Sequence, residues 1–524
     1  MLRFFDLIDL SKSFILKTCY IERAVYGILG FYGVYKVIYY TLLDPLRKIP
    51  GPWLNRLSEI SLIRANVNGD FTNYLLGLHE KYGHIVRVGP NKVSDARTKD
   101  FKKVLSTSRF KKSANYDGFA NVHQNLFSTR NDEFNRMRKR QVGPALRKSG
   151  LGSIDSSIEE VCVDAFVKKL NSIVDAGNGS AEFNFFKYYL NVAADVIGLL
   201  TFSENFHAIE NGDHPIIEWV DESMKNFGLS KSFPILKVAM AFIPSLSVNE
   251  SKLSKFCLEA IDKRRQLIKS GKIDTDHVDI LQMYITAVNT SNKKPLTDEE
   301  LVAEMVTMVI VGVISTSATM TWLTTFYLLY PKVYNRVVDE IRTTFPDKNK
   351  KITAKEAHEK LPYFTATIYE GLRFRGSVGG SLNRDVPNGG VELSGYFIPQ
   401  DTIVSMFIPG CHADTEVWEN PKSYNPDRFL GPNGDELKKE LVSFSTGVRA
   451  CVGRNLAYME IFMIMSNLLR NFDISAPKDW EYNTNILDPT RNNEPLLPRD
   501  ITNAVRTPAN PERDSRVVIT RCEH

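Results

Sequence analysis

The segment FSTGVRACVGR, from Phe444 to Arg454, surrounds a single cysteine with glycines and arginines. Gly447 and Gly453 allow a tight turn of the backbone and the close approach of a flat ligand. The residues after Gly453 have the pattern of a helix, so Cys451 is predicted to lie just before a helix N-terminus, where the dipole and free amides stabilise a thiolate. Such a thiolate can be the axial ligand of heme iron, and Arg449 is suited to pair with a heme propionate.

Five positions in this segment together resemble a known family. Phe444, Gly447, Arg449, Cys451 and Gly453 match, at every spacing, the cysteine loop of the cytochrome P-450 heme-thiolate enzymes. The resemblance implies that Cys451 ligates the iron of heme b and that the other four residues surround the cofactor. An inert core cysteine in a glycine-containing loop would be the ordinary reading of Cys451 alone, and the five matched positions count against it.

Two charged motifs upstream resemble further parts of the same family. EGLR, from Glu370 to Arg373, is similar to the family's Glu-x-x-Arg, and PDRF, which contains Arg428, is similar to its Pro-Glu-Arg-Phe segment. The resemblance implies that Glu370, Arg373 and Arg428 form a buried structural triad, in which one carboxylate between two guanidiniums makes several charge-assisted hydrogen bonds. A Glu-x-x-Arg alone is a common pair on a helix surface, and its partners in the same order make it specific.

Two more arginines are assigned to the heme propionates by the resemblance. Phe134 and Arg138 stand where the family often has Trp-x-x-x-Arg, and Arg384, in NRDVPNGG, matches another arginine that faces a propionate. Phe134 departs from the usual Trp or His, which weakens only the hydrogen bond of that residue. Arg138 and Arg384 are therefore expected at the cofactor together with Arg449.

A long helix is predicted to cross the catalytic region. In TDEE, Thr297 can cap the first turn while Glu300 reaches back to its amide, and the run then continues without proline as far as Pro331. About thirty-three residues at ~1.5 Å each give a length of roughly 50 Å. Its middle is apolar on all sides, which predicts a buried central helix. Gly312 is costly in such a helix, and indicates a close approach either of a ligand or of a neighbouring helix.

This helix departs from the family pattern at the positions that handle protons. The usual (Ala/Gly)-Gly-x-(Asp/Glu)-Thr-(Thr/Ser) is VGVIST here. Gly312 is kept, which leaves room for dioxygen, but Ile314 replaces the acid and Ser315 replaces the first threonine. Thr316 and Ser317 add two hydroxyls, so a water-assisted proton relay is one hypothesis, with Gly312, Ser315 and Thr316 as the predicted catalytic residues. The alternative is an enzyme that does not activate dioxygen.

The elements around these motifs are predicted to be mainly helical with a small β portion. Lys81 to Ser94 predicts two short strands around a turn at GPN, and the chain is then mostly helical to about residue 380. Short strands and turns follow, another helix comes after Cys451, and Arg516 to Arg521 predicts a terminal strand. No linker divides the chain convincingly, so residues 49–524 are expected to be one catalytic domain with the cytochrome P-450 fold.

Residues 1–48 are predicted to be a membrane anchor with a basic flank. Ala24 to Leu43 is an apolar run interrupted only by Lys36, and twenty helical residues span ~30 Å, the thickness of a bilayer's hydrocarbon core. Arg47 and Lys48 favour a cytosolic side for the residues after them. No cleavage site is evident, so a single-pass anchor in the endoplasmic reticulum membrane is expected. An amphipathic helix that lies on the membrane or packs on the domain is the alternative.

The composition excludes several other classes of protein. The 524 residues are 43% hydrophobic and 24% charged, as in a folded protein, and a net charge of +5 gives no indication of a nucleic-acid partner. The six cysteines are far apart and contain no CxxC, which counts against a disulfide framework or a zinc ribbon.

These observations predict a membrane-anchored heme-thiolate monooxygenase. It would insert one oxygen atom from O2 into a small apolar or aromatic substrate, with electrons from NADPH through the flavin of an NADPH-cytochrome reductase. Lys112 to Arg140 is loosely similar to fungal benzoate para-hydroxylases, which adds an aromatic acid as a candidate substrate. Two alternatives stay open: a heme-thiolate isomerase, dehydratase or oxidative coupling enzyme without a reductase, and a membrane-tethered interaction protein with a lapsed heme site.

The basic segment RMRKRQVGPALRK is predicted to dock the reductase. Arg138 is expected to point inward, and a solvated basic helix without a partner is the alternative. The remaining candidate surface cations are Arg136, Lys139, Arg140, Arg147 and Lys148.

Overall fold

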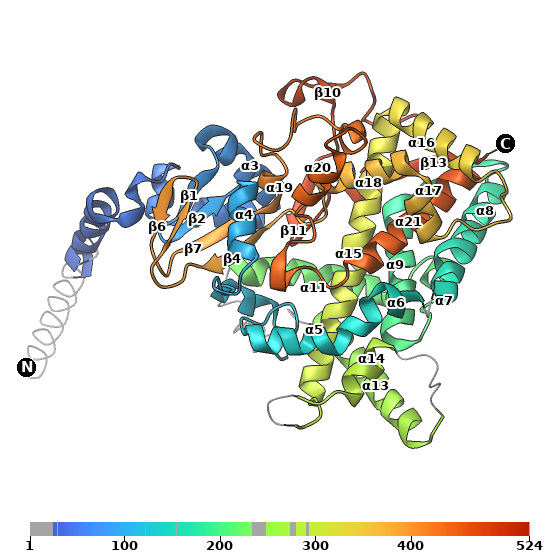
Figure 1. Cartoon of the computed structure of the whole chain (residues 1–524), viewed down its shortest axis with the longest axis horizontal. Helices are drawn as coiled ribbons and strands as arrows, with labels where there is room; N and C mark the ends of the chain where they lie inside the picture. Colours follow the sequence, from blue (N-terminus) through green and yellow to red (C-terminus); the bar gives the residue numbers. More distant parts are fainter. Residues whose placement is uncertain are drawn as a thin grey trace, which may run out of the picture.

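The computed structural model describes residues 25–28, 30–120, 122–152, 155–232, 248–272, 279–289 and 293–522 of the chain. This part of the chain is mainly helical, and its largest sheet lies at one side of the helical body (Figure 1). The prediction of a mainly α chain with a small β portion is confirmed.

The helices are distributed along the whole of the described chain. Their bounds are α2 Ile60–Val67, α3 Phe71–Tyr82, α4 Thr98–Leu105, α5 Asp132–Leu146, α6 Lys148–Gly152, α7 Asp155–Glu159, α8 Phe166–Ala176, α9 Phe185–Phe202, α10 Ala208–Asn211, α11 Pro215–Ser232, α13 Val248–Lys269, α14 Ile280–Thr286, α15 Asp298–Leu329, α16 Pro331–Thr344, α17 Ala354–Lys360, α18 Pro362–Arg375, α19 Ile408–Cys411, α20 Gly434–Glu440, α21 Arg454–Asn471 and α22 Pro511–Asp514. Two short 3₁₀ turns bear on the site, η7 Pro426–Phe429 and η8 Gly447–Arg449.

The largest sheet has four strands in the order β1-β2-β7-β4. The predicted pair of strands is confirmed, because β1 ends at Gly89 and β2 begins at Lys92, and the two pair antiparallel. Strand β2 pairs parallel with β7, and β7 pairs antiparallel with β4. The bounds of these strands are β1 Ile85–Gly89, β2 Lys92–Asp95, β7 Ile403–Phe407 and β4 Ser381–Asp385.

The C-terminal strand joins three distant parts of the chain. Strand β13, Arg516–Arg521, pairs antiparallel with β3, Ser180–Asn184, on one side and with β8, Phe472–Ser475, on the other. The predicted terminal strand is therefore confirmed. Three two-stranded sheets complete the β portion: β5 Val391–Leu393 with β6 Tyr396–Ile398, β9 Leu487–Asp488 with β10 Glu494–Pro495, and β11 Asp500–Asn503 with β12 Val505–Pro508.

Helix α15 crosses the middle of the helical body (Figure 1). Its predicted capping box is confirmed: the Thr297 hydroxyl accepts from the Glu300 amide at 3.3 Å, and the Glu300 carboxylate accepts from the Thr297 amide at 2.9 Å. The helix ends at Leu329, two residues before Pro331, because a proline in the next turn would have no amide to donate. Most of its side chains are buried, as a helix that is apolar on all sides requires.

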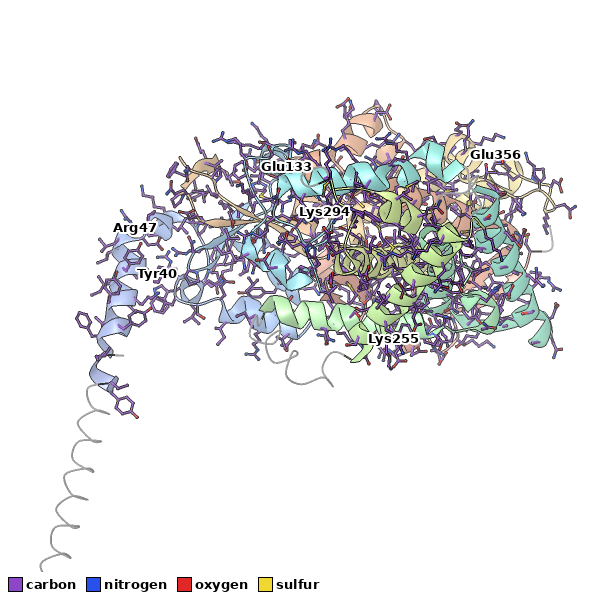
Figure 2. The ribbon with its side chains drawn as sticks, turned by 90° about the horizontal axis from the view of Figure 1, so that it is seen from below. Tyr40, Arg47, Glu133, Lys255, Lys294 and Glu356 are labelled. Atoms are coloured by element: carbon purple, nitrogen blue, oxygen red, sulfur yellow. The ribbon has the colours of Figure 1, made fainter. Side chains whose placement is uncertain are left out.

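The described residues of the predicted membrane anchor form a helix with exposed apolar side chains. Residues 25–28 and 30–38 are helical, and a π-helical turn, η1 Tyr39–Leu43, follows. Tyr26, Ile28 and Phe31 are 71%, 68% and 77% exposed. This segment extends away from the body of the protein, beyond Tyr40 and Arg47 (Figure 2). Residues 1–24 and Leu29 lie outside the described residues.

Two helices of the described residues are long and apolar enough to cross a membrane. They are α9 and α15, and most of each apolar window is buried inside the protein. Both therefore have the character of core helices, and the domain that follows the N-terminal helix is built around them.

Candidate functional site

The cysteine segment is a tight loop between η8 and α21. The amide of Cys451 donates to the carbonyl of Phe444 at 2.9 Å, so the loop folds back on itself. Gly447 has a φ of +69°, and a Cβ at this position would lie 2.3 Å from the backbone oxygen of Leu105. Only glycine fits there, because a side chain would meet rigid backbone. Cys451 is an exposed free cysteine three residues before α21, as the sequence predicts.

The surroundings of Cys451 act on its thiol in two opposite directions. Cys451 has accessible surface, but the protein atoms around it reduce the hydration of its thiol and so raise its pKa, whereas the backbone amides of Gly453 and Arg454 and the positive charge of Lys139 lower it. A Cβ on Gly453 would lie 3.9 Å from the Cys451 sulfur. Free amides at a helix N-terminus stabilise an anionic sulfur, and the charge of a bound metal deprotonates a thiol ligand outright.

Three buried cations from distant segments lie close to the cysteine loop. Lys112 and Arg384 are 7% and 3% exposed, and Arg449 donates to Asp132 at 2.8 Å. In the part of the chain that the structure describes, the Arg384 guanidinium donates only to the carbonyl of its neighbour Asn383, at 2.8 Å, and to the Tyr116 hydroxyl, at 3.5 Å. Burial lowers the pKa of Lys112 well below its usual range, and the charges of Arg384 and Arg449 lower it further. Asp132 is thus one carboxylate among three cations, and a bound group with two carboxylates would complete the pairing.

Lys112 is a member of this group that the sequence did not reveal. Its backbone forms a β-bridge with Arg384, and its ammonium donates to the Phe127 carbonyl. The ammonium also lies over the rings of Tyr116, at 4.1 Å, and of Phe127, at 4.6 Å. These contacts join parts of the chain that are far apart in the sequence, so nothing next to Lys112 could indicate them.

Arg138 is buried, as expected, but its partners are carboxylates of the protein. Its guanidinium pairs with Glu300 at 2.7 Å and with Glu304 at 3.2 Å, both on α15, and stacks on the ring of Phe134 at 4.6 Å. A propionate was the expected partner. The structure thus places Arg138 in a different cluster from Arg384 and Arg449, because the N-terminal turns of α15 bring two carboxylates against α5.

The structure brings together the three residues of the expected triad. Arg373 donates to both carboxylate oxygens of Glu370, at 2.7 and 2.8 Å, and Arg428 Nε lies 3.1 Å from Glu370 Oε2. Arg373 also donates to the carbonyls of His412, Pro421 and Ser423. The triad therefore ties α18 to the loop after α19 and to η7, the segments that lead to the cysteine loop.

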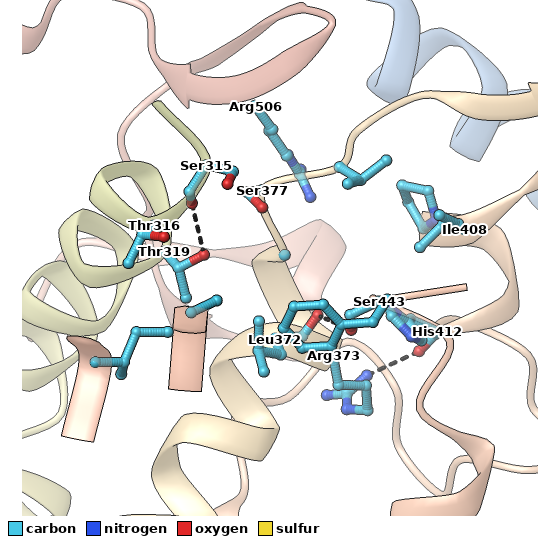
Figure 3. Close-up of a pocket in the computed structure, with 16 residues that line it drawn as sticks. Ser315, Thr316, Thr319, Leu372, Arg373, Ser377, Ile408, His412, Ser443 and Arg506 are labelled. Carbon is cyan, nitrogen blue, oxygen red and sulfur yellow. Dashed lines mark hydrogen bonds between the residues drawn. The ribbon is translucent and has the colours of Figure 1, made fainter. Parts of the chain in front are cut away.

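A cavity lies between α15, the end of α18, β12 and the cysteine segment. Protein atoms leave about 480 Å³ of space there, part of which is open to solvent. Helix α15 contributes Ser315, Thr316 and Thr319 (Figure 3). Phe444 and Ala457 contribute from either side of Cys451 in the sequence. The other side chains are largely apolar, with Leu372, Val378, Ile408 and Ile461 among them.

The hydroxyls predicted for a proton relay have different positions. Ser315 and Thr316 line the cavity, and Ser315 donates to the carbonyl of Val311 at 2.9 Å. Thr319, which the sequence did not single out, also lines the cavity and donates to the carbonyl of Ser315 at 3.0 Å (Figure 3). Ser317 is turned away and donates to the backbone of Tyr189 on α9 at 3.1 Å.

Gly312 and Ile314 face the packed interior. A Cβ on Gly312 would lie 2.2 Å from the Cδ1 of Ile197, so the glycine allows α15 to approach α9 closely. Of the two explanations for Gly312, close approach of a ligand or of a neighbouring helix, the structure supports the helix contact. Ile314 is buried, at 6% exposure, and its side chain has no ionisable group. Helix α15 therefore has no acid at the position where the resemblance places one.

The residues of this region fit a heme. A free cysteine lies before a helix N-terminus, a glycine keeps its loop tight, and a cavity opens between the long helix and the cysteine segment. The buried cations around Lys112 have too few anions within the protein, which is what two propionates would supply.

Comparison with known proteins identifies the family. The model of the cytochrome P450 family matches residues 50–493. Cytochrome P450 monooxygenase helB1 of Aspergillus fumigatus is 32% identical, over 93% of this chain and 84% of its own length. Cytochrome P450 monooxygenase BipB of Cochliobolus sativus is 30% identical, over 87% and 92%. The chain therefore belongs to the cytochrome P450 family, and it is an enzyme of the monooxygenase class to which these fungal relatives belong.

A solved structure supports the fold. The crystal structure of the cytochrome P450DA heme domain superposes with a TM-score of 0.74, over 91% of this chain and 98% of that one, at 18% identity. The predicted family and fold are both confirmed, and membership in the family implies a heme bound through a thiolate.

Proposed function

We propose that this protein is a membrane-anchored heme-thiolate monooxygenase that inserts one oxygen atom from O2 into a small, largely apolar substrate. The observation that carries the proposal is the exposed thiol of Cys451 before α21, close to a group of buried cations of which only Arg449 forms an ion pair with a carboxylate among the described residues. The apolar lining of the adjoining cavity is suited to an aliphatic or aromatic substrate.

The residues that would hold heme b come from four parts of the chain. Cys451 would ligate the iron, with Gly447 and Gly453 shaping its loop and Phe444 packing beside it. Arg384 and Arg449, joined by Lys112, would pair with the propionates. Arg138 supports this arrangement through Glu300 and Glu304, which hold α5 against α15. The heme, when bound, supplies the redox centre at which dioxygen is reduced.

Ser315 and Thr316 would deliver protons on the side of the cavity formed by α15. Both line the cavity, and a hydroxyl can accept a proton from water and pass on its own. Gly312 contributes by setting the distance between α15 and α9 rather than by contact with the cavity.

Electrons would come from NADPH through the flavin of an NADPH-cytochrome reductase at the endoplasmic reticulum membrane. The exposed apolar side chains of residues 25–43 support insertion of that helix into lipid. Arg47 and Lys48 follow it, which favours a cytosolic position for residues 49–524.

The proposal is tested by the absorption spectrum of the reduced, carbonyl-treated protein. We expect the shifted Soret band of a thiolate-ligated heme in the full-length protein and its loss in Cys451→Ala. Cys257→Ala, which removes a buried cysteine on α13, is the control and should keep the band. A band that survives in Cys451→Ala would overturn the assignment of the iron ligand.

A second candidate function is favoured by Ile314. A heme-thiolate isomerase, dehydratase or coupling enzyme needs no proton delivery to dioxygen, and α15 carries a buried isoleucine at the position of the usual acid. Consumption of NADPH that depends on both substrate and reductase supports the monooxygenase. Turnover in the absence of reductase supports the second candidate.

A further inference from the structure

Arg506, one of two arginines in the wall of the cavity, has hydrogen-bond donors that no described residue accepts from. Arg373 and Arg506 both line the cavity, but the guanidinium of Arg373 is occupied by Glu370 and by three backbone carbonyls. Arg506 is bonded through Nε to Asp500. Its two terminal nitrogens donate to no group in the described part of the chain. His412, the remaining titratable group in the wall, is neutral at pH 7, because burial lowers its pKa to about 3.

The charges around Arg506 do not balance. Asp500 is shared with a second guanidinium, that of Arg375, at 3.3 Å. Burial alone would raise the pKa of Asp500, but Arg375 and Arg506 lower it below its usual range, so the carboxylate is ionised. Burial lowers the pKa of Arg375 to about 9, which leaves it protonated at pH 7. Two cations therefore share one anion beside the cavity, and one positive charge is left over.

The backbone holds Arg506 in a defined place. Its amide donates to the carbonyl of Ser377 at 2.7 Å, and its carbonyl accepts from the indole of Trp322 on α15 at 3.1 Å. Ser377 and Ser315 line the same cavity, and Figure 3 shows Arg506 on the side of the cavity that carries these two serines. A guanidinium fixed in this way loses little conformational freedom when it binds an anion.

We propose that Arg506 binds a carboxylate of the substrate through its two terminal nitrogens, with Ser377 as a neighbouring hydroxyl donor, while the substrate's apolar part contacts Leu372, Val378 and Ile461. This assignment rests on the proposed monooxygenase function and narrows its substrates to apolar acids. A planar guanidinium matches a carboxylate in a two-bond geometry, and the surplus positive charge beside an apolar cavity favours an anion.

The heme propionates do not compete for this arginine. The charges of the cations proposed for them, Lys112, Arg384 and Arg449, act on one another near Asp132, and none of the three lines this cavity. A carboxylate bound by Arg506 is therefore a different one.

The test measures binding by the heme absorbance change that a ligand causes, with three acids and their uncharged methyl esters as probes. The probes are dodecanoate, 4-phenylbutanoate and 4-methoxybenzoate, which differ in shape and share only the carboxylate. The full-length, heme-loaded protein is expected to bind at least one acid about tenfold or more tightly than its ester, because a charge-assisted hydrogen bond is worth about that ratio. Equal affinity for acid and ester in all three pairs would overturn the proposal.

Variants of Arg506 test whether this residue causes the preference for an acid over its methyl ester. Arg506→Gln keeps Asp500 paired with Arg375 and is expected to lose the acid preference, whereas Arg506→Lys keeps part of it. Arg499→Gln removes an exposed arginine that pairs with Asp70 and is the matched control, with an unchanged preference. An undiminished preference in Arg506→Gln would overturn the assignment. If Arg506→Gln loads no heme, the comparison of Arg506→Lys with wild type decides instead.

The failure of this inference is distinct from failure of the proposed function. A protein without the thiolate-type carbonyl band contradicts the proposed function itself. A protein with that band and with equal affinity for acids and esters contradicts only the role of Arg506.

Discussion

Ser315 and Thr316 are the hydroxyls that α15 presents to the cavity at the place where the family usually has an acid and a threonine. The residue at the position of the acid is Ile314, which has no ionisable group, so Ser315 and Thr316 are the hydroxyls nearest to that position through which a proton can be passed. Proton delivery at this position therefore depends on the neutral hydroxyls of Ser315 and Thr316, which can donate hydrogen bonds to water and accept them from it.

Removal of both hydroxyls is expected to uncouple the enzyme. In Ser315→Ala combined with Thr316→Val, product formed per NADPH should fall several-fold and hydrogen peroxide should rise, because reduction continues while proton delivery fails. Ser317→Ala is the control, since Ser317 faces α9 and should leave coupling unchanged. An unchanged ratio of product to NADPH in the double variant would exclude a relay through these residues.

Glu460 on α21 is expected to make stability fall as the pH rises. Burial raises its pKa to about 8, and the Thr316 hydroxyl offsets only part of that rise. The native protein therefore holds a proton that the unfolded chain releases above about pH 4.3, and stability declines until about pH 8. Glu304, whose pKa burial raises to about 7, contributes in the same direction.

Substitution of Glu460 measures how much this carboxyl contributes to the fall in stability with rising pH. Glu460→Gln should show a smaller loss in the urea midpoint between pH 5 and pH 8 than wild type, because one of the carboxyls whose pKa is raised by burial is gone. The exposed Glu359→Gln is the control and should keep the wild-type slope. A slope equal to wild type in Glu460→Gln would show that its carboxyl does not titrate in this range.

At the scale of elements, the segments around the cysteine loop depend on one carboxylate. Glu370 accepts from Arg373 on its own helix, from the amide of Asn425 and from Arg428 in η7. Its oxygens thus connect α18 to the chain that precedes the cysteine loop. Loss of this one side chain would leave two buried guanidiniums without an anion.

Glu370→Ala is expected to destabilise the fold by ~3–5 kcal/mol and to yield little soluble, heme-loaded protein. The urea midpoint and the heme content per protein measure the effect. Glu436→Ala removes an exposed carboxylate that pairs with Lys439 on α20, and this control should cost less than ~1 kcal/mol. Normal yield and a normal midpoint for Glu370→Ala would contradict the structural role of the triad.

At the scale of the whole molecule, basic residues of α5 lie next to the cysteine loop. Lys139 on α5 donates to the carbonyls of Val448 and Ala450, so α5 lies directly against that loop. Lys139 is therefore engaged rather than available at the surface, in contrast to the expectation from the sequence. Arg136 and Arg140 on the same helix are exposed, and within the described residues their guanidiniums donate to backbone carbonyls of α5 alone.

Reversal of these two charges should slow electron delivery from the reductase. In Arg136→Glu combined with Arg140→Glu, turnover with reductase is expected to fall several-fold at low salt and less at high salt, while turnover with added peroxide is unchanged. Lys252→Glu with Lys255→Glu is the control on α13, and Figure 2 shows Lys255 at the opposite edge from Glu133 of α5. Equal loss of both activities would assign the two arginines to the fold instead.

Local signals in the sequence were sufficient for several elements and for the core of the site. The capping box at Thr297, the turn after Gly89 and the helix after Gly453 each depend on residues within one or two turns, so their bounds could be predicted. The cysteine loop around Cys451 also consists of residues close together in the sequence, so it could be recognised from their spacing. These features involve backbone groups that only their neighbours can satisfy.

Only the tertiary structure decided which charged groups meet. Arg138 pairs with Glu300 and Glu304, and Lys112 joins Arg384 and Arg449, across more than a hundred residues of chain. Backbone hydrogen bonds with Ser377 and Trp322 hold Arg506 at the cavity, and no motif near Arg506 in the sequence predicts these contacts. The physical reason is that a buried charge must find an opposite charge or a hydrogen-bond partner in space, and the packing of helices and strands determines which partners are within reach.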